Sequence, residues 1–334
     1  MITAGRHDDA RLYEKEARTL REYGRTVVIL CGDYEGVDSS GIRFVKVKGG
    51  SGFFAGRRLI RASKRIQAGY YHLYGAELLR LAKPLHRRAK VIWEPAAPAE
   101  WEEPEARNLK RLFGVVVSTP KGYSNYKPHV RRTFQLGDYP VEEAAEKRRF
   151  LRREPNEMTV CRMGELSEQG GLFPLLEAVS LLKCKLTLLG PFSDEVFEER
   201  VRQSEAFSPE CHLKEGSKKE FRKLLSEASA GVVTPLAWDA DRGLPSELFS
   251  YMAMGLPVIV PNFAPFRDII EEYNCGICVN PSNSEEISSA VAYIGRNPDV
   301  AAEMGENGKK AVRTRFHWEG EKEKLALLYR CSLL

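Results

Sequence analysis

Residues 243–261, GLPSELFSYMAMGLPVIVP, decide the fold of this chain. They predict a polar loop led by a glycine, then a short helix, a Gly-Leu-Pro turn and a buried strand. Pro245 suits the first turn of a helix, Ser246 is a good cap, and Gly255 can end the helix in a left-handed conformation. The apolar run at 258–260 is typical of a parallel strand that is covered on both faces. A helix that begins at the edge of such a sheet is a ready site for an anion such as a diphosphate.

Strand and helix patterns alternate on both sides of this stretch, which predicts parallel sheets with helices on both faces. In the first half, strands are expected at 2–4, 27–31, 42–47, 70–74, 89–93 and 115–118, and helices at 9–23, 57–67 and 76–89. In the second half, strands are expected at 158–163, 185–189, 212–214, 231–235, 258–260 and 275–279, and helices at 171–182, 195–203, 218–227, 285–296, 298–316 and 319–333.

The polar stretch 137–157 interrupts the alternation and marks a domain boundary. We expect an N-terminal domain at 1–140, a linker at 141–157, a second domain at 158–316 and a C-terminal helical segment at 317–334 that packs back across a cleft. The length of 334 residues with 43% hydrophobic content suits two domains with real cores.

Apolar runs and cysteines exclude several classes of protein. No apolar run approaches the roughly 20 residues that cross a bilayer, and the start MITAGRHDD has no signal-peptide core, so we expect a cytoplasmic protein. Seven scattered cysteines do not make a disulfide framework. The pair Cys275 and Cys278 has no second pair and no neighbouring histidine, so we expect buried thiols and no metal.

The charge is distributed unevenly along the chain. Residues 1–150 carry 29 basic and 18 acidic side chains, a net of +11, whereas residues 151–334 carry 22 and 28, a net of −6. Between Arg57 and Lys90, ten basic residues face one acid, Glu77. Such a patch can hold a protein on anionic lipid or orient a phosphate-bearing acceptor, and the alternative is a solvated face. No nucleic-acid-binding motif accompanies it, so no nucleic acid partner is expected.

Several segments resemble, in order and spacing, the retaining GT-B glycosyltransferases of family 4, the glycosyl transferases group 1. These segments are residues 5–28, 70–82, 164–191 (GELSEQGGLFPLLEAVSLLKCKLTLLGP), 212–236, 243–261 and 303–318 (EMGENGKKAVRTRFHW). The resemblance implies two Rossmann-like doubly wound domains facing a cleft. It also implies transfer of a sugar from a nucleoside diphosphate sugar to a carbohydrate or lipid-linked acceptor, without metal or other cofactor, in cell-envelope polysaccharide or glycoconjugate synthesis.

The resemblance also implies site residues. The expected donor-binding residues are Gly164, Glu165, Gly190, Ser217, Gly243, Leu244, Pro245, Ser246, Glu247 and Ser250. The expected acceptor-side residues are Gly5, Arg6, His7 and Arg11, and the catalytic candidates are Glu247 and His7. Each has a plainer interpretation: turn geometry for the glycines, a helix cap for Ser217, and a first-turn acid stabilised by the helix dipole for Glu247.

The chain departs from the family pattern where charge matters. Glu165 and Gly170 stand where the family carries basic residues for the leaving diphosphate, Ser250 stands in place of a ribose-binding glutamate, and Ala96 stands in place of a histidine. Glu247, one helical turn before Ser250, can replace that glutamate. These departures raise a second hypothesis, a catalytically impaired protein of the same fold that acts as a binding or scaffold subunit. A third is another activity on the same fold, such as an epimerase or a phosphorylase.

Overall fold

The computed structural model of the protein describes residues 1–3, 9–47, 53–95, 107–141, 150–208, 210–214, 218–238 and 243–330. The chain forms two compact units. Unit 1 comprises Met1–Val141, Ala240–Gly243 and Trp318–Leu334, and unit 2 comprises Glu142–Asp239 and Leu244–His317.

Unit 1 is built on a sheet of eight strands in the order β3-β4-β2-β1-β5-β6-β7-β8. The pair β3 and β4 is antiparallel, and the other neighbours are parallel. Its elements are β1 (Ile2–Thr3), the π-helix η1 (Ala10–Ala17), α1 (Arg18–Glu22), β2 (Val28–Cys31), β3 (Gly36–Val37), β4 (Arg43–Lys46), α2 (Phe53–Lys64), β5 (Tyr70–Tyr74), the 3-10 helix η2 (Ala76–Leu81), α3 (Ala82–Leu85), β6 (Lys90–Glu94), β7 (Gly114–Val117), α5 (Pro120–Tyr126), β8 (Thr133–Gln135) and α13 (Trp318–Tyr329).

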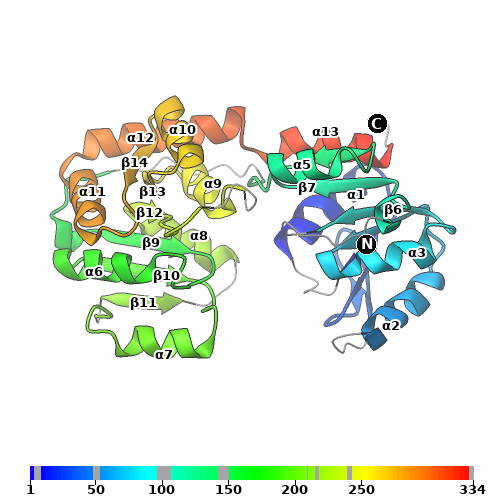
Figure 1. The fold of residues 1–334 in the computed structure, drawn as a ribbon. Helices are drawn as coiled ribbons and strands as arrows, with labels where there is room; N and C mark the ends of the chain where they lie inside the picture. Colours follow the sequence, from blue (N-terminus) through cyan, green and yellow to red (C-terminus); the bar gives the residue numbers. More distant parts are fainter. Residues whose placement is uncertain are drawn as a thin grey trace. The chain divides into compact units, whose positions relative to one another are not determined.

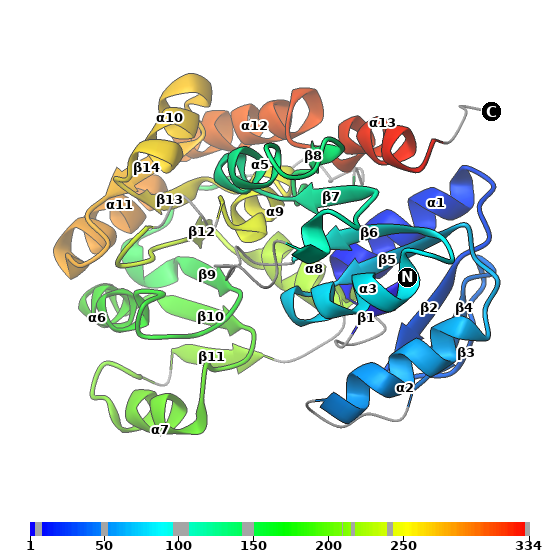
Figure 2. The same cartoon turned by 45° about the vertical axis from the view of Figure 1, so that its right-hand side comes forward.

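Helices cover both faces of this sheet because its central strands are apolar on both sides. In β6, Val91 and Trp93 pack with α2, η2 and α3, whereas Ile92 packs with η1, α1 and α13. Figure 2 shows α2 and α3 on one face of the sheet. The last helix, α13, belongs to this core, and its Trp318 indole donates a hydrogen bond to the Thr19 hydroxyl at 2.9 Å.

Unit 2 is built on a parallel sheet of six strands in the order β11-β10-β9-β12-β13-β14 (Figure 1). Its elements are the 3-10 helix η3 (Pro155–Glu157), β9 (Thr159–Met163), α6 (Leu172–Leu182), β10 (Lys185–Leu189), α7 (Glu195–Gln203), β11 (Cys211–Lys214), α8 (Lys218–Glu227), β12 (Ala230–Val232), α9 (Ser246–Ala253), β13 (Val258–Pro261), α10 (Ala264–Tyr273), β14 (Gly276–Val279), α11 (Ser284–Arg296) and α12 (Pro298–Thr314).

The strand order of unit 2 has one reversal point. Counted within the unit, it is 3-2-1-4-5-6, so the chain moves outward from β9 to β11 and then crosses back to β12 on the other side of β9. In open parallel sheets, ligands bind outside the carboxyl ends of the strands at this point. The loops that follow β9 and β12 therefore mark where a ligand is expected. The two units with parallel sheets confirm the predicted fold class.

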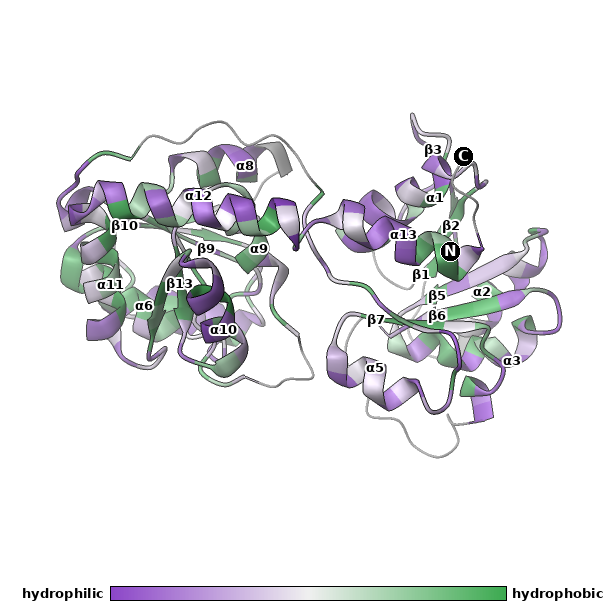
Figure 3. Cartoon of the chain, turned by 90° about the horizontal axis from the view of Figure 1, so that it is seen from above, coloured by the Kyte–Doolittle hydropathy of each residue, from purple (hydrophilic) through white to green (hydrophobic). Residues whose placement is uncertain are grey.

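The stretch 243–261 forms the predicted loop, helix, turn and strand, with one correction. Strand β13 is fully buried between β12 and β14 and is coloured as hydrophobic in Figure 3. Gly255 has a φ of +67°, and its N–H and that of Leu256 bond back to the carbonyls of Met252 and Tyr251, a Schellman ending. Ser246 is not the cap: Pro245 holds that position, and no side chain caps the helix.

Other predicted elements differ in detail or were missed. The predicted helix 76–89 is a 3-10 helix followed by the short α3, because Pro84 has no N–H to continue the hydrogen-bond ladder. Five elements were not predicted from the sequence: β3, α5, β8, η3 and α10. Among the described residues, no helix is both long and apolar enough to cross a membrane. Five of the described cysteines are buried, Cys278 is half-buried, and all six are unpaired.

Candidate functional site

The carboxyl edge of the unit 2 sheet brings together three of the predicted donor-site residues. Gly164 follows β9 with a φ of +95°, and Gly190 follows β10 with a φ of +142°. A Cβ atom on Gly164 would lie 2.2 Å from the Glu247 carboxylate, and one on Gly190 would lie 2.2 Å from the Gly164 carbonyl oxygen. Both positions therefore require glycine, for conformation and for space.

Helix α9 presents its first turn to this edge. Glu247 lies half-buried in that turn, where the positive end of the helix dipole stabilises a carboxylate. Ser250 donates its hydroxyl to the Ser246 carbonyl at 3.0 Å, so this hydroxyl is engaged by the helix itself. Buried Tyr251 accepts a hydrogen bond from the Met163 N–H at 2.6 Å and so ties α9 to the end of β9. Burial raises the pKa of Tyr251 well above its usual value.

The loop before α9 supplies the remaining donor-site positions. Gly243 has a φ of +66°, and Leu244 and Pro245 are half-buried. Ser217 of the donor set lies outside the described residues, as do Gly5, Arg6, His7 and Ala96.

Arg162, near the end of β9, holds the turn that follows this strand. Its guanidinium donates to the carbonyls of Met163, Glu165 and Gly170 at 3.3, 3.5 and 3.3 Å. A Cβ atom on Gly170 would lie 2.7 Å from an Arg162 Nη atom. Glu165 is exposed. From the sequence alone, Arg162 is expected on a strand in a structural role rather than in phosphate binding. The available signal was a cation inside an apolar strand pattern, one residue before its carboxyl end.

A cavity of about 560 Å³ adjoins Gly190. It is lined by Gly190, Pro191, Phe192, Asp194, Glu195, Glu198, Arg202 and Leu213. Arg202 is paired with Glu198 at 2.6 Å, so carboxylates dominate the lining. The cavity suits an uncharged, hydrogen-bonding group better than a phosphate.

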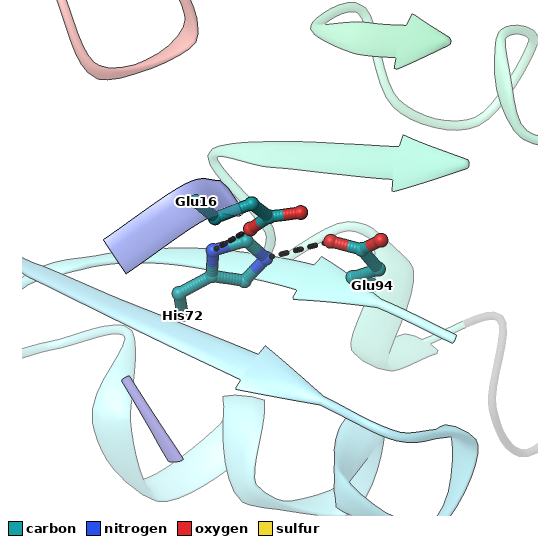
Figure 4. Close-up of side chains that lie close together, drawn as sticks. All are labelled: Glu16, His72 and Glu94. Carbon is teal, nitrogen blue, oxygen red and sulfur yellow. Dashed lines mark ion pairs between the residues drawn. The ribbon is translucent and has the colours of Figure 1, made fainter. Parts of the chain in front are cut away.

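Arg11, predicted on the acceptor side, lies in a buried ionic cluster of unit 1. It donates to Glu94 and to the Gly137 carbonyl. Figure 4 shows His72 between Glu16 and Glu94. Its Nδ1 atom lies 3.5 Å from a Glu16 oxygen, and its Nε2 atom lies 3.5 Å from a Glu94 oxygen. The His72 Nδ1 atom also forms a hydrogen bond with the Tyr329 hydroxyl of α13, at 2.7 Å.

The pKa values of the two carboxylates in this cluster are shifted in opposite directions. Burial and the charge of Glu94 raise the pKa of Glu16 well above its usual value. Burial would also raise the pKa of Glu94, but Arg11 and His72 outweigh it and hold that pKa at about 2. Burial lowers the pKa of His72. The lowered pKa of Glu94 favours its carboxylate form beside Arg11, and the raised pKa of Glu16 favours its protonated form.

The same cluster has the donor set of a metal site. One donor atom each from Glu16, His72 and Glu94 lies within 4.8 Å of the others. Arg11 already supplies a cation to Glu94. The cluster joins η1, β5, β6 and α13 through its side chains. Within the described residues, five of its buried atoms have no hydrogen-bond partner: Arg11 Nη2, both Glu16 carboxylate oxygens, His72 Nε2 and Glu94 Oε2.

Two Rossmann-like units with parallel sheets are the GT-B architecture of glycosyltransferases. The sequence profile of the family Glycosyl transferases group 1 matches residues 143–311, half of the chain. The chain belongs to this family of glycosyltransferases. Among curated proteins, none matches it significantly.

Solved structures share the fold across almost the whole chain. A sucrose-phosphate synthase from Thermosynechococcus elongatus is 16% identical, with a TM-score of 0.75 over 98% of this chain and 94% of that one. A glycosyltransferase from Rickettsia africae is 14% identical, with a TM-score of 0.76 over 99% and 98%. HepE from Anabaena, solved with UDP and glucose, is 10% identical, with a TM-score of 0.75 over 99% of both chains.

Proposed function

We propose that the protein transfers a sugar from a nucleoside diphosphate sugar to a carbohydrate or lipid-linked acceptor. The observation that carries this proposal is the reversal point of the unit 2 sheet, where Gly164, Gly190 and Glu247 meet. The two glycines allow the ends of β9 and β10 and the Glu247 side chain to pack closely together, and the N-terminus of α9 favours an anion. Family membership supports the same reaction class.

Uracil is the first donor base to test. The Anabaena HepE structures contain UDP, or UDP-glucose, and superpose on nearly the whole chain. The acid-lined cavity beside Gly190 offers hydrogen-bond acceptors to a base or a sugar.

The proposed reaction retains the anomeric configuration and needs no metal. Its main demand is stabilisation of the charge that develops on the leaving diphosphate, which fixed dipoles and cations of the site can supply. We assign Glu247 to a ribose hydroxyl of the donor, because Ser250 directs its own hydroxyl to the helix backbone. His7 stays a catalytic candidate on the acceptor side.

We further propose that the protein works in the cytoplasm, on the inner face of a membrane, in cell-envelope polysaccharide or glycoconjugate synthesis. The support is the basic stretch Arg57–Lys90, which includes the exposed Arg57, Arg58 and Arg61 on α2. Anionic lipid attracts such residues with about 1 kcal/mol each. A lipid-linked acceptor would be met at the same surface.

A second candidate is a binding or scaffold subunit without turnover. It is favoured by the exposed carboxylate of Glu165 at the loop that would face a diphosphate, and by the engaged hydroxyl of Ser250. Like charges facing each other weaken binding and oppose the developing charge of the transition state.

Turnover separates the two candidates. We would incubate the purified protein with UDP-glucose, EDTA and a panel of carbohydrate and lipid-linked acceptors. The GDP-, ADP- and TDP-linked sugars would follow with the same acceptors, and release of the nucleoside diphosphate would be measured. The proposal predicts release that EDTA does not reduce and that Glu247→Ala lowers by about tenfold or more, the worth of one charge-assisted hydrogen bond. Glu177→Ala, an exposed site on α6, is the matched control. Binding of a diphosphate without any release would support the scaffold instead.

A further inference from the structure

Arg162 is a buried cation that no carboxylate of the described residues neutralises. The residue is 7% exposed, its Nη atoms donate to three backbone carbonyls, and within the described residues its Nε atom has no hydrogen-bond partner. Two neighbouring arginines differ: Arg200 pairs with Glu168 at 2.8 Å and Arg202 pairs with Glu198 at 2.6 Å. A buried charge without a counterion is costly, so this position calls for an anion.

The position of Arg162 matches the place where a ligand is expected. It pairs with Leu188 on β10, and its own strand, β9, borders the reversal point between β9 and β12. The carbonyls that it holds belong to the turn 163–170, which contains Gly164 against Glu247. Arg162 therefore holds the turn that carries Gly164, one of the residues of the candidate site.

None of the side chains in the turn 163–170 is basic, so Arg162 is the cation next to this turn. Gly170 has no side chain, and the Arg162 guanidinium occupies the space where one would begin. Glu165 adds a negative charge, but it is exposed and therefore screened by solvent. The guanidinium is shielded from water, so its field at the site is stronger than that of an exposed residue.

We propose that Arg162 is a donor-binding residue that supplies positive charge to the diphosphate of the nucleotide. This inference rests on the proposed function and extends it to a residue outside the expected donor set. The proposed ligand carries at least two phosphate charges, because the nucleoside portion is uncharged and does not attract a cation.

The test compares a nucleoside diphosphate with its own nucleoside. We would measure the Kd of UDP and of uridine, and likewise for the GDP, ADP and TDP pairs, with wild type, Arg162→Gln and Arg162→Lys. Glutamine keeps N–H donors for the carbonyls but removes the charge, whereas lysine keeps the charge and loses the planar fork. Arg296→Met, an exposed site at the end of α11, is the control.

The proposal predicts that Arg162→Gln weakens UDP by about tenfold or more and leaves uridine unchanged, while Arg162→Lys keeps most of the UDP affinity. It is overturned if the ratio of the UDP and uridine affinities is the same in Arg162→Gln as in wild type, since Arg162 then only holds the turn. Equal loss of UDP affinity in both variants also overturns it. If wild type binds none of the diphosphates, the proposed function fails first. Urea unfolding of each variant verifies that it is folded.

Discussion

At the scale of single residues, burial decides what the charged groups of this protein do. Glu16, His72 and Glu94 are almost fully buried, yet they contribute to stability in different pH ranges. The lowered pKa of Glu94 gives stability that is complete above its unfolded value of 4.5 and is lost as the pH falls toward 2. The lowered pKa of His72 gives stability that is complete above 6.5 and is lost below it.

Glu16 acts in the opposite direction. Its pKa is raised, so the folded state holds a proton that the unfolded state releases above pH 4.5, and stability falls as the pH rises through that range. We therefore expect Glu16→Gln to be more stable than wild type at pH 8, with a gain that shrinks toward pH 5. Urea unfolding at both values measures it, with exposed Glu177→Gln as the control. A gain that is the same at pH 5 and pH 8 would contradict the assignment of the proton to Glu16.

Part of the candidate site could be predicted from the sequence and part could not, for a physical reason. Gly164, Gly190 and Glu247 are recognisable because each lies in a local pattern of strand end or helix start. The cluster of Arg11, Glu16, His72 and Glu94 joins a helix to two strands far apart in sequence. A local sequence pattern cannot predict contacts between residues so far apart, so Arg11 alone of the four was named as a candidate.

At the scale of elements, the segment from α9 to β13 shows how much of the structure a local sequence pattern determines. The order of helix, turn and strand, and the left-handed ending at Gly255, followed from the residues alone. The missed α10 begins directly after β13. Pro265 in its first turn was an available signal, but the capping position is held by Phe263, whose side chain cannot cap a helix. The first residue of α9 was also misjudged, because Pro245 and Ser246 each suit either of two adjacent positions.

Gly255 offers the sharpest test at this scale. With a φ of +67°, alanine there is strained, and its Cβ atom would lie 2.4 Å from the Lys309 side chain. We expect Gly255→Ala to destabilise the protein by about 1–2 kcal/mol. The control is Gly69→Ala, where a Cβ atom meets nothing within 4 Å. If both variants unfold at the same urea concentration as wild type, the Schellman ending does not stabilise α9 as described.

At the scale of the whole molecule, the charge asymmetry of the chain predicts where it binds. We expect wild type to bind vesicles that contain anionic phosphatidylserine and not neutral vesicles, with binding reduced by salt. Glutamate at Arg61, Lys64 and Arg65 together should reduce binding by about a hundredfold or more, at about 1 kcal/mol per residue. Sedimentation with vesicles measures the loss.

The matched control for the lipid surface replaces Arg296, Lys310 and Arg313, three exposed basic residues of unit 2, with glutamate. This variant has the same net charge as the first one. Equal loss of binding in both variants would mean that the effect depends on net charge alone and that α2 is not a docking surface.

The central claim is that the carboxyl edge of the unit 2 sheet binds a nucleoside diphosphate. Calorimetric titration of wild type and Glu247→Ala with UDP, GDP, ADP and TDP tests it most directly. The account predicts micromolar binding of one of these nucleotides, weakened by about tenfold or more in Glu247→Ala. Absence of binding to all four, or binding that Glu247→Ala leaves unchanged, would contradict it.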